Sequence, residues 1–425
     1  MGIYRYIFIY TLLFCVSLSI REKEEIMKKF ASLLLAVVLG ATLLTGCGDS
    51  TATTGTDAAT TETAVTETAA TGATFKIGGI GPITGGAAVY GNAVKNGAQI
   101  AIDEINAAGG INGAQIEYKF EDDEHDAEKA INAYNTLKDW NMQILMGTVT
   151  SAPCIAVSEK SKEDNVYQIT PSGSAVPCTQ YDNAFRICFS DPQQGTASAQ
   201  YIGQNNLSTK VGVIYDSSDV YSSGIYEKFA AEAANQPFEI VSAEAFTADN
   251  KTDFTTQLQK AKDAGADLVF LPFYYQEATL VLSQADTMGY TPAFFGCDGL
   301  DGILDVENFN TKLAEGVMLL TPFAADATDD TTVSFVTQYK ERYGETPNQF
   351  AADAYDAIYT IKAAIEKSGA TPDMDASAIC DAMKGAMTQI SVDGLTGAAM
   401  TWTAEGEVDK TPKAVEIKDG VYVLK

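Results

Sequence analysis

Residues 211–246 read VGVIYDSSDVYSSGIYEKFAAEAANQPFEIVSAEAF, and this stretch decides the fold class. The apolar run Val211–Tyr215 predicts a strand, Ser222–Ala234 predicts a helix, and Glu239–Ala245 predicts a second strand. Strands that alternate with helices of this length are typical of parallel sheets covered by helices on both faces. The stretch therefore predicts an α/β fold.

The same alternation extends over most of the chain. Further strands are predicted at Phe75–Ile80, Ile116–Phe120, Ile144–Met146, Val166–Ile169, Leu268–Leu271 and Ala293–Phe295, and short strands around Gly406 and Gly420. Further helices are predicted over Asn92–Ala108, Ala127–Trp140, from Ala152, Thr252–Ala264, Ala278–Met288 and Asn348–Lys367. The pattern repeats in two blocks, about 75–190 and 195–300, which predicts two doubly wound parallel-sheet lobes. Ligands in such sheets sit beyond the carboxyl ends of the strands.

The N-terminal region has the pattern of an export signal. From Met27 the chain has two lysines, an apolar run from Phe30 to Leu44, and the sequence Leu-Thr-Gly before Cys47. Basic, apolar and small-residue segments in this order are typical of a secretory signal. The segment 27–46 resembles a lipoprotein signal, with Cys47 as the lipidated first residue of the mature chain. A transmembrane helix is the alternative, but the apolar run is short for a span of roughly 20 residues.

The segments on either side of this signal have different expected roles. Residues 1–26 carry a second apolar run, and we interpret them as a mis-called N-terminal extension. Residues 47–73 are rich in Thr, Ala, Gly and acids, which predicts a flexible tether. The export signal predicts an extracytoplasmic protein held at the outer face of the cytoplasmic membrane, or in a periplasm.

Charge and cysteine content restrict the function further. The chain has a formal net charge of −28 and one histidine, which argues against binding to nucleic acid or an anionic bilayer. Of its seven cysteines, five lie beyond the export region, and they lack zinc-site spacing. A disulfide among Cys154, Cys178 and Cys188 is expected outside the cell, without a fixed pairing.

Several motifs together resemble the leucine/isoleucine/valine-binding proteins, which are substrate-binding components of ABC importers with the type I periplasmic-binding-protein fold. The first is the run from Gly81 to Asn92, GPITGGAAVYGN. The others are NAAGGING from Asn106, Ile-Thr-Pro at 169–171, Tyr-Asp at 215–216, FGCDG from Phe295 and Leu-Thr-Gly at 395–397. These motifs follow one another in the order and spacing of that family, and the resemblance extends over nearly all of residues 74–425.

The resemblance implies where the lobes divide. It implies an N-terminal lobe of 74–190 and 322–394, and a C-terminal lobe of 191–321 and 395–425. Three crossing segments near residues 190, 320 and 395 would join them.

The resemblance also implies the ligand contacts. Ser151, at a helix start before Pro153, would bind the ligand carboxylate, and free N–H groups with the helix dipole favour an anion there. Ser172 and Ser174 would add hydroxyl groups, where the relatives usually have Ala and Thr. Asp298, in place of the usual Glu, would neutralise an ammonium group. Tyr221 and Tyr274 would close over the ligand, and Tyr90 and Phe350 would line its wall. The alternatives are an ordinary helix cap, a Pro-Ser-Gly-Ser turn, an exposed loop aspartate and packing aromatics.

Enzyme and metal functions are less well supported. The run Gly79 to Gly85 with Tyr134 and Lys138 loosely suggests a dehydrogenase, but Pro82 interrupts the turn and an exported chain has no nicotinamide supply. His125 and its acidic neighbours at 121–126 suggest a solvated loop. Calcium is an alternative there, although the glycine of an EF-hand loop is absent.

The sequence therefore predicts a monomeric lipoprotein, without enzymatic activity, cofactor or metal, that captures a small amino acid, most simply a branched-chain one, for an ABC permease in the membrane. Two alternatives remain open. One is the same fold carrying an amide, urea, or an aromatic or carboxylic acid. The other is a sensory binding protein that feeds a receptor.

Overall fold

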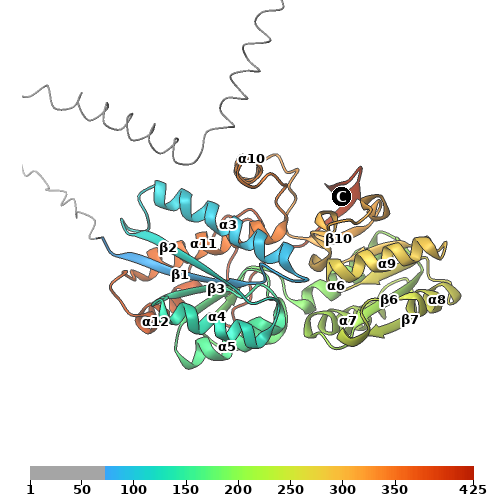
Figure 1. Ribbon diagram of the computed structural model, residues 1–425, viewed down its shortest axis with the longest axis horizontal. Coiled ribbons are helices and arrows are strands. Elements are labelled where there is room, and N and C mark those ends of the chain that lie inside the picture. The colour runs from blue at the N-terminus through green and yellow to red at the C-terminus, as the bar shows by residue number, and fades with distance from the viewer. Residues whose placement is uncertain (1–71) are drawn as a thin grey trace, which may run out of the picture. The chain divides into compact units, whose positions relative to one another are not determined.

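The structure, a computed structural model, describes residues 72–425, and all of them belong to one compact unit. They build two sheets of predominantly parallel strands covered by helices on both faces (Figure 1). We define the N-terminal lobe as the five-stranded sheet with its helices and the C-terminal lobe as the seven-stranded sheet with its helices. The predicted α/β class with two doubly wound lobes is confirmed.

The N-terminal lobe is built on the strand order β2-β1-β3-β4-β5, with every pairing parallel. The strands are β1 (Thr74–Gly81), β2 (Gln115–Asp122), β3 (Ile144–Gly147), β4 (Tyr167–Thr170) and β5 (Ala184–Arg186). The helices are α3 (Ala88–Ala107), α4 (Ala127–Asp139), α5 (Ser151–Glu163), α11 (Gln349–Ser368) and α12 (Ala376–Met387), with the 3-10 turn η1 (Val176–Thr179). Figure 1 shows α3 and α11 on one side of this sheet and α4 and α5 on the other.

The C-terminal lobe has the strand order β12-β11-β10-β9-β8-β6-β7, and only the pairings of β11 are antiparallel. Its strands are β6 (Lys210–Asp216), β7 (Glu239–Phe246), β8 (Leu268–Leu271), β9 (Ala293–Gly296), β10 (Met318–Thr321), β11 (Lys413–Lys418) and β12 (Val421–Leu424). Its helices are α6 (Asp191–Gln204), α7 (Val220–Ala233), α8 (Thr255–Asp263) and α9 (Tyr275–Thr287). Short 3-10 turns, η2 (Ala248–Asn250), η3 (Asp298–Leu300), η4 (Ile303–Asp305) and η5 (Thr311–Ala314), lie in its connections. Helix α10 (Asp330–Tyr343) follows β10 and contacts α3.

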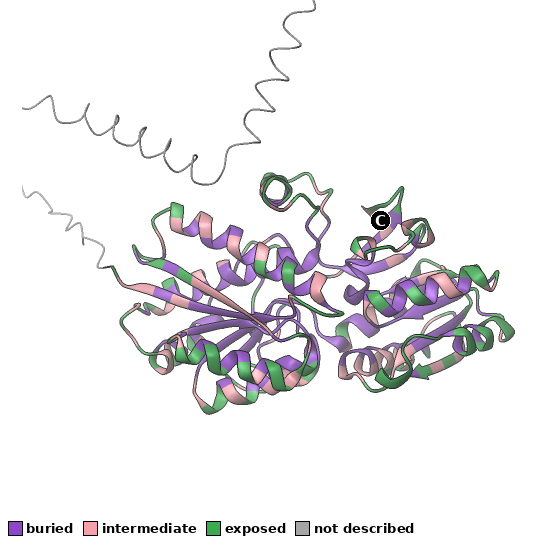
Figure 2. Ribbon diagram, in the orientation of Figure 1, coloured by how far each residue is buried: buried purple, intermediate pink, exposed green. Residues whose placement is uncertain are grey.

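The cores explain the continuous apolar runs of the strands. In β8, Leu268 and Phe270 belong to the apolar cluster that includes α6 and α7, whereas Val269 and Leu271 belong to the cluster on the other face. Alternate side chains of a strand point to opposite faces, so a strand covered on both faces must be apolar throughout. Figure 2 shows the resulting pattern, with buried strands and exposed outer faces of the helices.

A glycine sets the spacing between the two helices that carry first-lobe wall residues of the site. A Cβ atom on Gly97 of α3 would lie 2.0 Å from the carbonyl oxygen of Ala351 in α11. Two helices can approach this closely only where one of them lacks a side chain. The contact fixes α11, and therefore Phe350, against the N-terminal sheet.

Three segments cross between the lobes, after β5, after β10 and before β11. The segment from Leu395 to Lys410 bonds to the N-terminal lobe. Leu395 N donates to Asp356 Oδ1 (2.8 Å), the Trp402 indole donates to the Arg186 carbonyl (2.8 Å), and Lys410 Nζ lies 3.1 Å from Asp353 Oδ1. On these contacts we propose that the N-terminal lobe extends to about residue 410, rather than to 394 as predicted, and that the third crossing follows it.

The sequence located most elements to within a few residues but missed others. Helices α6, α10 and α12 and the short strands β5 and β10 were not predicted. The predicted extension 1–26, signal 27–46, Cys47 and nearly all of the tether 47–73 lie outside the described residues. No helix among residues 72–425 has the length and apolar character needed to cross a bilayer.

Candidate functional site

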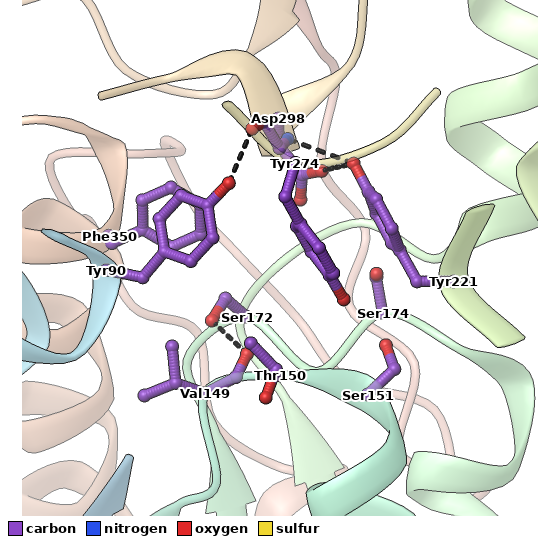
Figure 3. A pocket seen from close by; sticks show the side chains of 11 residues that line it. Tyr90, Val149, Thr150, Ser151, Ser172, Ser174, Tyr221, Tyr274, Asp298 and Phe350 are labelled. Atoms are coloured by element: carbon purple, nitrogen blue, oxygen red, sulfur yellow. Dashed lines mark hydrogen bonds between the residues drawn. The ribbon is translucent and has the colours of Figure 1, made fainter. Parts of the chain in front are cut away.

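A pocket between the two sheets collects residues from the loops and helix starts that follow strands of both lobes. It is lined by the eight residues predicted to bind ligand, Tyr90, Ser151, Ser172, Ser174, Tyr221, Tyr274, Asp298 and Phe350, and also by Val149, Thr150 and Gly299 (Figure 3). The structure therefore brings all eight candidates together, and their role in binding remains a prediction. The pocket has about 10 Å³ of space, enough for about one water molecule. An amino acid is larger, so its entry requires the side chains or the lobes to move apart.

The parallel sheets explain why these residues meet. Ser151 follows β3, Ser172 follows β4, Tyr221 follows β6, Tyr274 follows β8 and Asp298 follows β9. The carboxyl ends of parallel strands share one edge of a sheet, and ligands of open α/β sheets bind at that edge. Here the binding edges of the two sheets face the same pocket.

The floor of the pocket is the start of helix α5. Thr150 is its N-cap and Ser151 its first helical residue, so the cap lies one residue earlier than predicted. Ser151 Oγ accepts a hydrogen bond from Ala175 N (3.1 Å), which leaves its own proton available to a ligand. The helix has a partial positive charge at this end and unpaired N–H groups. This region can bind an anionic group such as a carboxylate.

The two predicted serines of the next loop have different environments. Ser172 Oγ donates to the Val149 carbonyl (2.6 Å), so its proton stabilises the pocket backbone rather than facing a ligand. Ser174 Oγ is buried and has no hydrogen-bond partner within 3.5 Å, and the buried Asp191 carboxyl is its polar neighbour. A buried hydroxyl without a partner is costly, which makes Ser174 the better candidate for direct contact with a ligand.

A buried arginine that sequence reasoning missed supports this loop. Arg186 is fully buried at the end of β5, and its guanidinium donates to the carbonyls of Gly173 (3.2 Å), Ser174 and Ala175 (3.0 Å). Its Nε atom lies 3.2 Å from Glu407 Oε1. A planar guanidinium with several fixed donors can hold several carbonyls at once. Arg186 therefore positions Ser174 without touching the pocket.

The opposite wall carries a buried acid. Asp298 is 4% exposed, and its Oδ1 atom accepts a hydrogen bond from the Tyr221 hydroxyl (2.6 Å). Burial raises the pKa of Asp298 to about 7, and nearby Asp353 adds to this, whereas the Tyr221 hydrogen bond opposes it. Gln194 Oε1 accepts from Asp298 N (3.2 Å) and fixes the backbone. This carboxylate gains a counter-charge if a ligand ammonium binds beside it.

Aromatic rings fill the space between the serines and Asp298. Tyr274 stacks on Tyr221 with ring centroids 4.9 Å apart and planes at 7°, and its centroid lies 5.8 Å from that of Tyr90. Tyr90 in turn packs on Phe350 at 4.3 Å. Figure 3 shows these rings between the serines on one side and Asp298 on the other. They provide apolar walls for a ligand with charged ends.

Hydrogen bonds join the lobes beside the pocket. The Tyr90 hydroxyl donates to the Gly299 carbonyl (2.5 Å) and accepts from Tyr275 N (3.3 Å). Gln349 Nε2 at the start of α11 donates to the Asp298 carbonyl (3.0 Å), and Gln349 N donates to Asp301 Oδ2 (2.8 Å). The described arrangement is therefore a closed one.

Two expectations about side chains near the pocket need correction. The loop at 121–126 is not simply solvated, because Asp123 is fully buried and the half-buried His125 reaches Thr150. Cys154, Cys178, Cys188, Cys297 and Cys380 are all unpaired and buried, so residues 72–425 contain no disulfide. Cys154 and Cys178 pack with Ala175 in a small apolar cluster as thiols. Within the same residues, no group of three or more His, Cys, Asp or Glu side chains is arranged to hold a metal ion.

Comparison with known proteins identifies the family. Residues 74–420 match the periplasmic binding protein family. The chain belongs to that family. Members of the family are substrate-binding proteins, and the predicted resemblance to the Leu/Ile/Val-binding proteins is confirmed. A Brucella melitensis Leu/Ile/Val-binding protein homolog is 31% identical over 72% of this chain and 82% of its own length. The Rhizobium johnstonii Leu/Ile/Val-binding protein BraC3 is 31% identical over 73% of this chain and 84% of its own.

Solved structures agree with the fold. The branched-chain amino acid transporter substrate-binding protein LivJ from Streptococcus pneumoniae, in complex with isoleucine, is 29% identical with a TM-score of 0.74, covering 83% of this chain and 100% of that one. The leucine-binding protein LivK from Thermotoga maritima is 26% identical, also with a TM-score of 0.74, covering 83% and 97% of the two chains. A solute-binding protein of R. palustris in complex with benzoate has a TM-score of 0.73, but at 21% identity it shows the fold alone.

Proposed function

We propose that this chain captures a branched-chain amino acid outside the cytoplasm and delivers it to an ABC permease. The observation that carries the proposal is that one end of the pocket suits an anionic group and the other end suits a cationic group. A helix N-terminus and the serine hydroxyls of Ser151 and Ser174 lie on one side, the Asp298 carboxyl lies on the other, and aromatic rings lie between them. An α-amino acid with an apolar side chain has matching groups. The names of the relatives support the same ligand class.

Capture would proceed by opening and closing of the lobes. The N-terminal lobe supplies the carboxylate contacts at α5, and the C-terminal lobe supplies Asp298, Tyr221 and Tyr274. Only a closed arrangement, with the aromatic rings displaced from their described positions to make room, offers both sets to one ligand, so the ligand shifts the equilibrium toward closure. Hydrogen bonds such as those of Tyr90 and Gln349 then add to the stability of the closed form. The permease would have to separate the lobes to release the ligand.

The proposal is tested by thermal-shift screening of the mature chain, residues 47–425, against amino acids, amides and aromatic acids. A ligand that binds only the folded state stabilises it by RT ln(1 + [L]/Kd), which is about 2.7 kcal/mol at a hundredfold excess over Kd. We expect the largest shifts with leucine, isoleucine or valine. A large shift with an amide, urea or an aromatic acid, and none with these amino acids, would overturn the ligand assignment.

We also propose that the chain acts as a monomer anchored by a lipid on Cys47. The anchor is tested by metabolic labelling with a palmitate analogue and membrane fractionation, with Cys47→Ala as the matched control. The expected result is a labelled, membrane-bound protein that becomes unlabelled and released in the variant. Neighbouring permease and ATPase genes would support import, whereas a neighbouring receptor gene alone would support the sensory alternative.

A further inference from the structure

The single histidine of the chain lies between the two lobes at the edge of the pocket. His125 Nδ1 lies 2.8 Å from Thr150 Oγ1, and its ring packs edge-on against Tyr274, with centroids 5.3 Å apart and planes at 83°. Thr150 is the N-cap of α5, and Tyr274 belongs to the C-terminal lobe. Both partners line the pocket. His125 does not line it, so its contacts act on the ligand through these two residues.

The backbone that presents His125 has an unusual conformation. Glu124 and His125 have φ values of 49° and 61°, and they are the only adjacent non-glycine pair with positive φ among residues 72–425. Left-handed backbone is costly for such residues and persists only where the surroundings enforce it, often at functional sites.

Hydrogen bonds from the backbone to two carboxylates hold Glu124 and His125 in this conformation. Asp123 Oδ1 accepts from His125 N (2.9 Å), and Asp122 Oδ1 accepts from Glu124 N (3.0 Å). Asp122 also accepts from Ile83 N (2.9 Å) and the Thr84 hydroxyl (2.5 Å), in the loop that precedes α3. The acidic residues of this loop therefore hold the imidazole at the lobe boundary.

The imidazole makes its contacts in the neutral form. Burial lowers the pKa of His125, the Lys251 ammonium of the C-terminal lobe lowers it further, and Asp126 opposes both. At pH 7.5 the ring is neutral, so it packs against Tyr274 as one aromatic group against another and forms one hydrogen bond with the Thr150 hydroxyl. Because His125 and Tyr274 lie on different lobes, this packing is lost when the lobes separate.

We infer that His125 is a positioning residue for ligand capture, which orients Thr150 at the start of α5 and holds Tyr274 over the pocket when the lobes close. The inference rests on the proposed function. Aromatic pairs of this geometry contribute about 0.5–1.5 kcal/mol, which converts to roughly a 2- to 13-fold change in an equilibrium constant. Loss of the contact should speed ligand dissociation, because it stabilises only the closed form.

The experiment combines stopped-flow kinetics with NMR, and uses isoleucine as the probe. His125→Ala should raise the dissociation rate roughly 2- to 13-fold, and His125→Phe, which keeps a ring but loses the Thr150 bond, should raise it less. Asn132→Ala, an exposed position on α4, is the matched control and should change nothing. In wild-type protein labelled at the histidine Cε1 position, the one imidazole signal should shift on addition of isoleucine, and Tyr274→Ala should reduce that shift.

The outcomes separate this inference from the proposed function. If wild-type protein binds none of the branched-chain amino acids, the proposed function fails. If wild-type protein binds isoleucine but the imidazole signal does not move, or His125→Ala dissociates at the wild-type rate, only the role of His125 is overturned. The wild-type NMR titration decides the question even if the variants fail to fold.

Discussion

The role of Asp298 can be tested by replacing its charge while keeping its shape. In Asp298→Asn the side-chain oxygen can still accept the 2.6 Å hydrogen bond from Tyr221, and the 4% exposed site keeps its volume. What disappears is the negative charge that would face a ligand ammonium. Truncating one partner of a buried charge pair costs about 2–5 kcal/mol, so isoleucine should bind roughly 30- to 4,000-fold more weakly.

The pKa of this carboxyl adds a second, independent signature. Because burial raises the pKa of Asp298 to about 7, the group is mostly protonated at pH 6 and mostly ionised at pH 8. An ammonium ligand needs the ionised form, so wild-type affinity should be about tenfold lower at pH 6 than at pH 8. The Asp298→Asn variant should lack this dependence.

The assay is isothermal titration calorimetry at both pH values with two ligands. The second ligand is the desamino analogue of isoleucine, 3-methylpentanoate, which keeps the carboxylate and the apolar chain but has no ammonium. The substitution should weaken isoleucine binding strongly and should not weaken binding of the analogue. An equal loss for both ligands, or no loss for isoleucine, would refute the assignment of Asp298 to the ammonium.

Three other predictions follow from the same contacts. Ser151→Ala should weaken isoleucine binding by about 1.5–3 kcal/mol, and binding of isoleucinamide, whose carbonyl oxygen is uncharged, by only about 0.5–1.5 kcal/mol; equal losses in calorimetry would remove Ser151 from the carboxylate site. Lys410→Met should lower the free energy of unfolding in urea by about 3–5 kcal/mol, because it leaves the buried Asp353 carboxyl without the cation 3.1 Å away; a loss below 1 kcal/mol would contradict a formed ion pair. The free energy of unfolding should rise as the pH falls from about 7 to about 4, by up to about 1.4 kcal/mol per pH unit for each group. The reason is that aspartates with raised folded-state pKa values bind protons in the folded state at a higher pH than in the unfolded state. The aspartates with a folded-state pKa of about 7 are Asp123, Asp298 and Asp301; urea titrations that show falling stability over this range would contradict the prediction.

Local signals in the sequence were sufficient for much of the fold. Strand β8 was predicted with its observed bounds, Leu268–Leu271, because an apolar run between polar turns has few other interpretations. Helix α6 was missed although it carries a Ser190–Gln193 capping box, because its small and polar residues give a weak apolar period. Helix α12 was also missed, although its buried residues recur at helical spacing, at Ile379, Cys380, Met383, Ala386 and Met387.

The candidate site was foreseeable only in part. The start of α5 carries a physical signal, Ser151 with Pro153 two positions later, and the parallel sheet places Asp298 at the same edge as Tyr274. Neither signal shows that Arg186 supports the Ser174 loop or that His125 reaches Thr150, because these contacts join residues that are 12 and 25 positions apart through loops without periodicity. The acidic run around His125 resembled a solvated loop because its charges, taken alone, do not reveal that Asp123 is fully buried.

Calorimetric titration of the mature chain with isoleucine at pH 8 tests the central claim most directly. The account predicts saturable binding of one ligand per chain, with a negative heat-capacity change, because closure buries the apolar side chain among Tyr90, Tyr221, Tyr274 and Phe350. It also predicts that both the desamino analogue and isoleucinamide bind more weakly than isoleucine. Binding of isoleucine no tighter than that of either analogue would contradict a pocket that recognises both charged ends of an amino acid.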